Sequence, residues 1–234
     1  MASVISEVPI QPWRRRMYLP NYQIGEVARY AQISPQTVAA WHRPNDRRTL
    51  SQKEQRAALS YMQLIEVAVV AAFRRGGILL KDIRAAREYA SQVLRKEFPF
   101  SEYHFKTDGK NLLIDYEQIA GKKKGKGKLL VANRRGQLAW REIIGTLNEF
   151  EYGDGIAIRW HVAGKSSPVV IDPRIAFGAP TVAGMPTWVI KGRHDAGESD
   201  ADIADDFGIT KSEVQKALAF EAAAIANHGE NWVN

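Results

Sequence analysis

The sequence contains no cysteine. Disulfide bonds, zinc sites built on thiolates and cysteine nucleophiles are therefore excluded. The five histidines form no pair at metal-ligand spacing, and neither a G-x-S-x-G elbow nor an H-E-x-x-H helix occurs. We therefore expect a protein that is not an enzyme and that needs no metal or cofactor, and we assign no catalytic residue.

Long apolar runs are also lacking. The longest one, residues 65–73, is interrupted by Glu66 and is too short to span a bilayer. Near its start the chain carries Glu7, Pro9 and Pro12 where a signal peptide would have an apolar core. We therefore expect a cytoplasmic, nucleoid-associated protein that has no membrane partner.

Positive charge is in excess. The 33 lysines and arginines outnumber 26 acidic residues, which gives a formal net charge of +7. Such a balance favours a polyanionic partner. The hydrophobic content of 45% is typical of a globular protein, and 234 residues suffice for one large domain or two to three small ones.

Residues 22–42 have the layout of a helix-turn-helix. Ser34 is a predicted N-cap with Pro35 at the first helical position, which is a strong start signal for a second helix. Val38 and Trp41 give that helix an apolar side. A short helix with a polar front fits the major groove of DNA, although similar helix pairs occur in proteins that never bind nucleic acid.

Outward-facing and basic residues of this segment are the candidate DNA contacts. Gln36, Thr37 and His42 are predicted to reach base edges, where Gln36 can pair with adenine and Thr37 can touch a phosphate or a thymine methyl. The following loop, residues 43–50, is interpreted either as a wing whose arginines bind phosphates or as a solvated loop. The full set is Ser34, Gln36, Thr37, Ala40, His42, Arg43, Arg47 and Arg48.

Two further helices are predicted, over residues 59–75 and 81–96. The order of helix-turn-helix, arginine-bearing loop and the run LSYMQLIEVAVVAAFRRGGILLKDIRAAREYA resembles the DNA-binding domain of the MerR family over residues 22–90. The resemblance implies a winged helix-turn-helix. The chain departs from that family because the last helix stops near Pro99 instead of continuing into a long dimerisation helix.

Residues 103–163 read as a small α+β subdomain. Asp108-Gly109 between apolar runs predicts a hairpin, residues 129–131 and 156–162 predict strands, and residues 140–147 have helical spacing. The lysine-rich segment 121–128 lacks the spacing of a phosphate-binding loop. It is interpreted as a solvated loop or as an auxiliary contact with the DNA backbone.

In the C-terminal third, prolines and glycines over residues 168–186 predict an irregular path. Ser199 and Thr210 are predicted caps of two short helices, the first burying Ile203 and the second Val214. This pair could be a second helix-turn-helix, but its acidic residues would be repelled by phosphate. We therefore expect it to contact protein.

Four short runs in this region carry a second resemblance. They are Asp172-Pro173-Arg174, Gly178-Ala179-Pro180, Gly184-Met185-Pro186-Thr187 and Ala196-Gly197-Glu198-Ser199. Together they resemble a small antitoxin domain, formerly of unknown function, that accompanies PIN-like ribonuclease toxins. The whole chain is similar to VapB-type antitoxins of the mycobacterial kind.

This resemblance implies an N-terminal head that binds its own operator and a C-terminal part that blocks the toxin. Cations can cap the metal-binding carboxylates of a PIN-like nuclease, and an apolar anchor can sit beside them. The toxin-binding candidates are Arg174, Lys191, Arg193, Lys211 and Trp232.

The predicted fold is mainly α with a small α+β middle subdomain. It comprises a MerR-like DNA-binding domain (residues 1–100), a linking subdomain (101–166) and a small helical antitoxin domain with its tail (167–234). The predicted function is a homodimeric antitoxin that neutralises a PIN-like ribonuclease toxin and represses its operon by binding operator DNA. The alternative is a free-standing regulator that responds to a small ligand.

Overall fold

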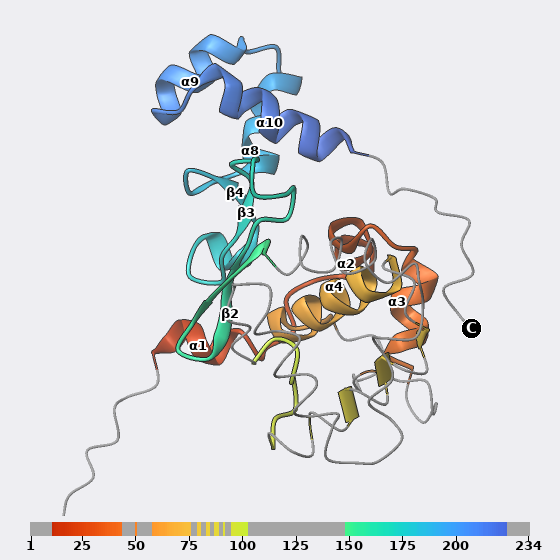
Figure 1. Cartoon of the computed structure of the whole chain (residues 1–234). Coiled ribbons are helices and arrows are strands. Elements are labelled where there is room, and N and C mark those ends of the chain that lie inside the picture. The colour runs from red at the N-terminus through yellow and green to blue at the C-terminus, as the bar shows by residue number, and fades with distance from the viewer. Residues whose placement is uncertain are drawn as a thin grey trace, which may run out of the picture.

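The computed structural model describes residues 11–43, 50, 58–75, 79–80, 83–84, 87–88, 91, 95–102 and 148–223. Its helices are α1 (Pro12–Arg16), α2 (Ile24–Ala31), α3 (Pro35–Trp41), α4 (Tyr61–Arg75), the 3-10 helix η2 (Ala176–Gly178), α8 (Thr187–Asp195), α9 (Asp200–Phe207) and α10 (Lys211–Ala222). Its strands are β1 (Phe150–Gly153), β2 (Ile156–Trp160), β3 (Val170–Ile171), β4 (Pro180–Val182) and β5 (Met185–Pro186). Figure 1 shows α2, α3 and α4 gathered at one end and α8–α10 at the other, with the strands between them.

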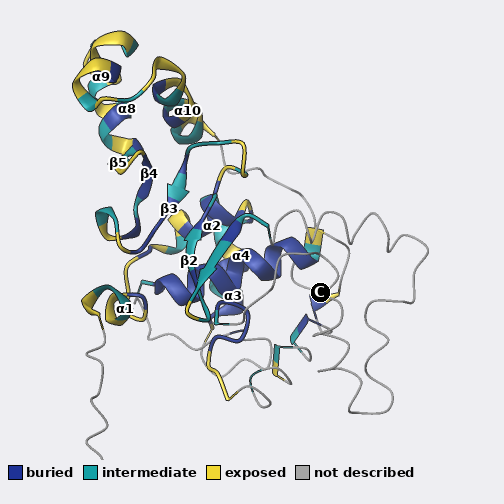
Figure 2. Ribbon diagram, turned by 60° about the vertical axis from the view of Figure 1, so that its left-hand side comes forward, coloured by how far each residue is buried: buried dark blue, intermediate teal, exposed yellow. Residues whose placement is uncertain are grey.

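The N-terminal head is built on α4. Every side chain of this helix from Tyr61 to Phe73 is buried, and Figure 2 shows α4 in the colour of buried residues over most of its length. An antiparallel bridge between Tyr22 and Leu59 holds the start of the helix-turn-helix against the start of α4. At the far end of α4, Nη1 of Arg75 donates a hydrogen bond to the carbonyl of Ala31 at 3.0 Å. The helix-turn-helix is therefore fixed to α4 at both ends.

One buried carboxylate on α4 holds the next stretch of chain. Glu66 accepts hydrogen bonds from the backbone N–H groups of Phe100, at 2.6 Å, and Ser101, and from Nε of Arg87 at 2.6 Å. Burial raises the pKa of Glu66, while the Arg87 charge and these hydrogen bonds oppose that rise. The predicted helix over residues 81–96 lies mostly outside the described residues.

The five strands form one antiparallel sheet in the order β1-β2-β3-β4-β5. The predicted strand at 156–162 is present as β2, whereas the irregular path predicted over 168–186 contains β3, β4 and β5. These strands have two or three residues each, which is too short for an alternating pattern to show in the sequence. The sheet is continuous across the predicted domain border between residues 166 and 167.

Three helices follow the sheet. α9 and α10 are the predicted pair, with Ser199 accepting a hydrogen bond from the backbone N–H of Asp202 and Thr210 from that of Glu213. Ile203 and Val214 are fully buried, as predicted. The helix α8 was not predicted, because its sequence TWVIKGRHD buries just Thr187 and Ile190 and so carries little helical periodicity.

The two helix pairs, α2–α3 and α9–α10, share one turn. In each, the residue after the first helix is left-handed, Gln32 with φ +55° and Gly208 with φ +62°. An isoleucine follows in each pair, Ile33 in the first and Ile209 in the second. Its backbone N–H donates a hydrogen bond to the carbonyl five residues earlier, at 3.0 Å in both cases. Ser34 or Thr210 then caps the second helix. The chain thus contains the same helix-turn-helix backbone twice.

The fold is therefore mixed α/β, combining helices with a five-stranded antiparallel sheet, and the winged helix-turn-helix expected for the head stays a prediction. The hairpin, strand and helix expected within residues 103–147 lie outside the described residues, as does the lysine-rich segment 121–128.

Candidate nucleic-acid and partner-binding surfaces

The exposed side of α3 is defined by helical spacing. Gln36 and Arg43 are exposed and Ala40 is half-buried, and these positions are four and three residues apart. Ser34, also half-buried, caps the helix by accepting a hydrogen bond from the backbone N–H of Thr37 at 3.1 Å. The structure thus places Gln36 and Ala40 on one outward stripe of α3, and the exposed Arg43 follows this helix directly after its C-cap His42.

Two of the predicted DNA contacts face inward. Thr37 is 3% exposed and His42 is 1% exposed. Thr37 lies one turn before the buried Trp41, so it shares the core side of α3, and its hydroxyl lies 2.8 Å from that of Ser34. His42 ends the helix with Nδ1 at 2.8 Å from the carbonyl of Val38. Their assignment to base edges is therefore corrected to structural roles. Arg47 and Arg48 lie outside the described residues.

Arg29 on α2 forms contacts with another part of the same chain. Nη1 of Arg29 lies 2.8 Å from a carboxylate oxygen of Glu221 at the end of α10. Its guanidinium also covers the rings of Tyr30 and Phe220, which stack with centroids 6.1 Å apart. This contact joins the head to the C-terminal helices.

A second contact joins the same two parts. The hydroxyl of Tyr22 donates to the carbonyl of Gly178 at 2.9 Å, and Nδ2 of Asn21 donates to the carbonyl of Phe177 at 2.7 Å. Burial raises the pKa of Tyr22 well above its usual range, so the hydroxyl stays a donor. Gly178 has φ +81°, and a Cβ there would lie 2.2 Å from the Tyr22 hydroxyl. Glycine is required at this close approach.

Arg174, predicted to bind the toxin, is held by its neighbour. Its Nε and Nη2 donate to the two carboxylate oxygens of the buried Asp172 at 2.8 and 2.6 Å, and Nε of Arg159 lies 3.3 Å from the same group. Burial acts to raise the pKa of Asp172, but the hydrogen bonds and charge of Arg174 outweigh it, so the pKa is lowered. Arg174 thus fixes the turn after β3.

The other predicted cations differ in their surroundings. Arg193 pairs with Glu198 and with Asp206, and its guanidinium lies over the ring of Phe207. Lys191 pairs with Asp195 at 2.6 Å on α8. Lys211 is exposed at the start of α10, and Trp232 lies outside the described residues.

The sequence did not point to the two most exposed large apolar side chains of the described region. Phe177 is 71% exposed and Trp188 is 64% exposed. Trp188 lies on the side of α8 opposite the buried Thr187 and Ile190, and the sequence did not mark it because it did not mark α8. Phe177 carries no local signal, because η2 is a single turn.

Two absences hold for the described part of the chain. It contains no group of three or more histidine and acidic side chains placed to hold a metal ion. None of its helices is long and apolar enough to cross a bilayer.

Comparison with known proteins finds a family match for the C-terminal region. Residues 169–220 match the family described as "Protein of unknown function (DUF433)". Over 232 residues, 89% of this chain and 96% of the relative, the sequence is 26% identical to the protein of Mycobacterium tuberculosis named "Putative antitoxin VapB45". The predicted resemblance to VapB-type antitoxins is thereby confirmed, and it supports a regulatory protein that is not an enzyme.

A solved structure shares the fold. The crystal structure of Rv2018 from Mycobacterium tuberculosis superposes with a TM-score of 0.65 at 22% identity, covering 87% of this chain and 99% of that one. The likeness of residues 22–90 to the MerR family stays a prediction.

Proposed function

We propose that this protein is the antitoxin of a toxin-antitoxin system, that its C-terminal region binds and blocks a PIN-like ribonuclease toxin, and that its head binds operator DNA to repress the operon. The observation that carries the antitoxin role is the similarity to an antitoxin-named protein along nearly the whole length of both chains.

The DNA-binding role is supported by the outward stripe of α3. Gln36 is an exposed amide on a short helix that is capped by Ser34 and packs against α2. An amide of this kind can bond adenine through both its donor and its acceptor. Arg43 at the end of the stripe suits a phosphate. Charge favours this unit over α9–α10 for DNA, because α9 exposes Asp202, Asp205 and Asp206.

The protein is proposed to act as a homodimer, because a single short recognition helix reads a weak half-site and two-fold operators match two-fold proteins. Sedimentation in the presence and absence of operator DNA measures this directly. A monomer that holds the full operator would contradict the dimer.

The decisive experiment is co-expression with the product of the neighbouring gene, followed by purification of the complex and a ribonuclease assay. We expect a stable complex that is silent until this chain is removed. Specific promoter binding without such a complex would contradict the antitoxin role and favour a free-standing regulator.

The head is tested by two variants measured on operator and on random DNA. Gln36→Ala is expected to weaken operator binding by about 1–3 kcal/mol and to leave random DNA nearly unchanged. Arg43→Ala is expected to weaken both alike and to reduce the salt dependence. Equal losses on both DNAs for the two variants would contradict the assignment of the reading stripe.

A further inference from the structure

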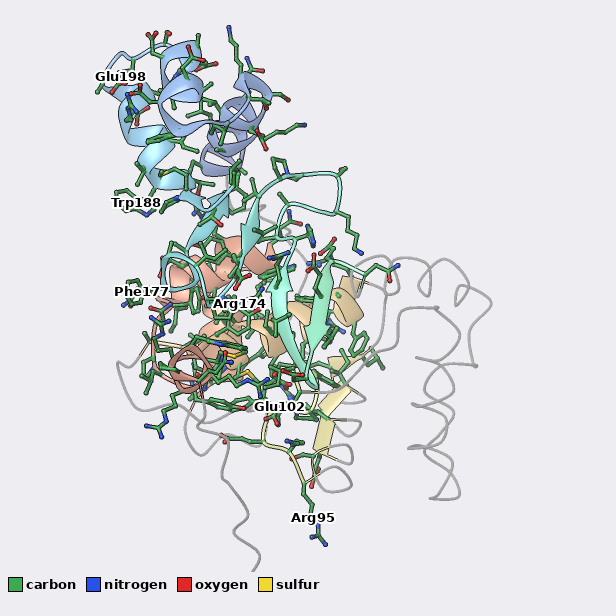
Figure 3. The ribbon with its side chains drawn as sticks, turned by 90° about the vertical axis from the view of Figure 1, so that its left-hand side faces the viewer. Arg95, Glu102, Arg174, Phe177, Trp188 and Glu198 are labelled. Atoms are coloured by element: carbon green, nitrogen blue, oxygen red, sulfur yellow. The ribbon has the colours of Figure 1, made fainter. Side chains whose placement is uncertain are left out.

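Two aromatic side chains form an exposed apolar surface on the C-terminal region. Phe177 lies on η2 and Trp188 on α8, within the stretch that matches the DUF433 family. Figure 3 shows both rings projecting from the same side of the molecule. We call this pair the aromatic face. Exposed aromatic residues of this size are the side chains most enriched at the energetic centres of protein interfaces.

Phe177 is held out rigidly. Ala176, Phe177 and Gly178 have φ values of +45°, +54° and +81°, a run of left-handed residues that turns the ring away from the sheet. Asn21 and Tyr22 bond the carbonyls of Phe177 and Gly178 and so fix the backbone on which the ring stands. A preorganised anchor loses little conformational entropy when a partner covers it.

Positive charge borders the aromatic face. The guanidinium of Arg16 lies 5.2 Å from the centre of the Phe177 ring, and its neighbour Arg15 on α1 is also exposed. A partner seated on Phe177 therefore meets the charge of Arg16, and Arg15 adds a second positive charge on the same helix. A protein surface whose apolar depression is rimmed by carboxylates is complementary to this arrangement.

Acidic residues on the same side argue against a nucleic acid as the occupant. A nucleic acid covering Trp188 would approach Asp195 on α8 and the exposed carboxylates of α9, which packs against α8, and would be repelled by them.

We propose that the aromatic face is the toxin-binding surface: Phe177 and Trp188 enter an apolar depression on the toxin, and Arg15 and Arg16 pair with carboxylates at its rim. This inference rests on the proposed antitoxin function. It takes the place of the earlier expectation that Arg174 and Arg193 bind the toxin, because both arginines form ion pairs within the chain.

The test is calorimetric titration of the full-length chain with the purified toxin encoded by the neighbouring gene. Phe177→Ala combined with Trp188→Ala is expected to raise Kd at least about 100-fold. Arg15→Glu combined with Arg16→Glu is expected to raise Kd at low salt and to remove much of the salt dependence of Kd. The matched control is Leu79→Ala, another exposed side chain, which follows the far end of α4, about 20 Å from the end that pairs with Tyr22. It is expected to change Kd less than about threefold. Circular dichroism verifies the fold of each variant.

Every outcome decides the proposal. Loss of affinity in the aromatic variant together with a normal control supports it. Binding of the toxin with unchanged Kd by the aromatic variant overturns this inference and leaves the antitoxin function in place. Absence of binding by the unaltered chain overturns both. Loss of self-association in the aromatic variant, with toxin affinity kept, assigns the face to a second copy and overturns the inference.

Discussion

The chain builds one helix-turn-helix backbone twice and gives each copy a different surface. The first helix exposes Glu26 in α2 but Asp202, Asp205 and Asp206 in α9, whereas the second helix exposes Gln36 in α3 and Lys211 and Lys216 in α10. The left-handed residue, the buried or half-buried isoleucine and the hydroxyl cap are shared between them. The turn chemistry therefore determines the backbone, and the outward charges favour a different partner for each copy.

The largest expected effect on stability comes from Gly178 of η2, which contacts Tyr22 at the start of the head. Gly178→Ala places a Cβ against the Tyr22 hydroxyl at 2.2 Å and also strains a positive φ. We expect a loss of about 3 kcal/mol in the free energy of unfolding, measured with denaturant.

The matched control for that variant is Gly184→Ala. Gly184 has φ +87° with open space around it, so the substitution carries the backbone strain without the clash. A loss of about 1 kcal/mol is expected. Equal losses for the two variants would show that the contact between Tyr22 and Gly178 adds nothing to the joint.

Substitutions of the isoleucine in each turn allow a direct comparison of the two helix pairs, α2–α3 and α9–α10. Ile33 is 1% exposed, whereas Ile209 is half-buried. Ile33→Ala is expected to cost about 3 kcal/mol in the free energy of unfolding, and Ile209→Ala about 1.5 kcal/mol, because less apolar surface loses its packing. Hydrogen exchange of α2 and of α9 locates each loss. A larger cost at Ile209 would contradict the difference in packing between the copies.

Acid is expected to act on the turn after β3, where Asp172 holds Arg174. The pKa of Asp172 is lowered in the folded chain, so its carboxylate stabilises the fold above the unfolded pKa of about 3.9, and this contribution is lost as the pH falls through the folded pKa. Asp172→Asn is expected to cost about 2 kcal/mol at neutral pH and to flatten the stability curve below about pH 4.

The control for the acid experiment is an exposed carboxylate. Asp195 pairs with Lys191 on the surface of α8, and Asp195→Asn is expected to change the free energy of unfolding by less than about 0.5 kcal/mol. If the free energy of unfolding of Asp172→Asn fell with decreasing pH as steeply as that of the unaltered chain, the role of Asp172 would be contradicted.

The smallest effect concerns the caps. Ser34→Ala removes the acceptor for the N–H of Thr37 and is expected to cost about 1 kcal/mol. Thr210→Ala is expected to cost about 0.5 kcal/mol, because Glu213 still accepts from the backbone N–H of residue 210. Thermal unfolding of both variants measures the difference. A Thr210 variant that loses more than the Ser34 variant would show that the carboxylate does not support the cap.

Local features of the fold were predictable from the sequence. The caps Ser34, Ser199 and Thr210 and the buried positions Ile203 and Val214 are confirmed, because caps and helical periodicity depend on neighbours within four residues.

Features that depend on distant residues were not predictable. The contact between Tyr22 and Gly178 spans 156 positions, and no local pattern marks it. Arg174 and Arg193 have the composition of binding residues, yet the folded chain pairs them with Asp172, Glu198 and Asp206. The burial of Thr37 was predictable, because Thr37 lies four residues before the apolar Trp41 and therefore on the same side of the helix.

The last turn of α10 makes the chain sensitive to cutting. Glu221 lies one residue before the end of that helix, and its carboxylate is shared between Arg29 of α2 and the hydroxyl of Thr187 at the start of α8. Helix ends fray and are accessible to proteases. A single cleavage before Glu221 would remove a support from α2 and from the start of α8 at once. Proteolytic damage at one end of the chain would thus be transmitted to the head at the other end.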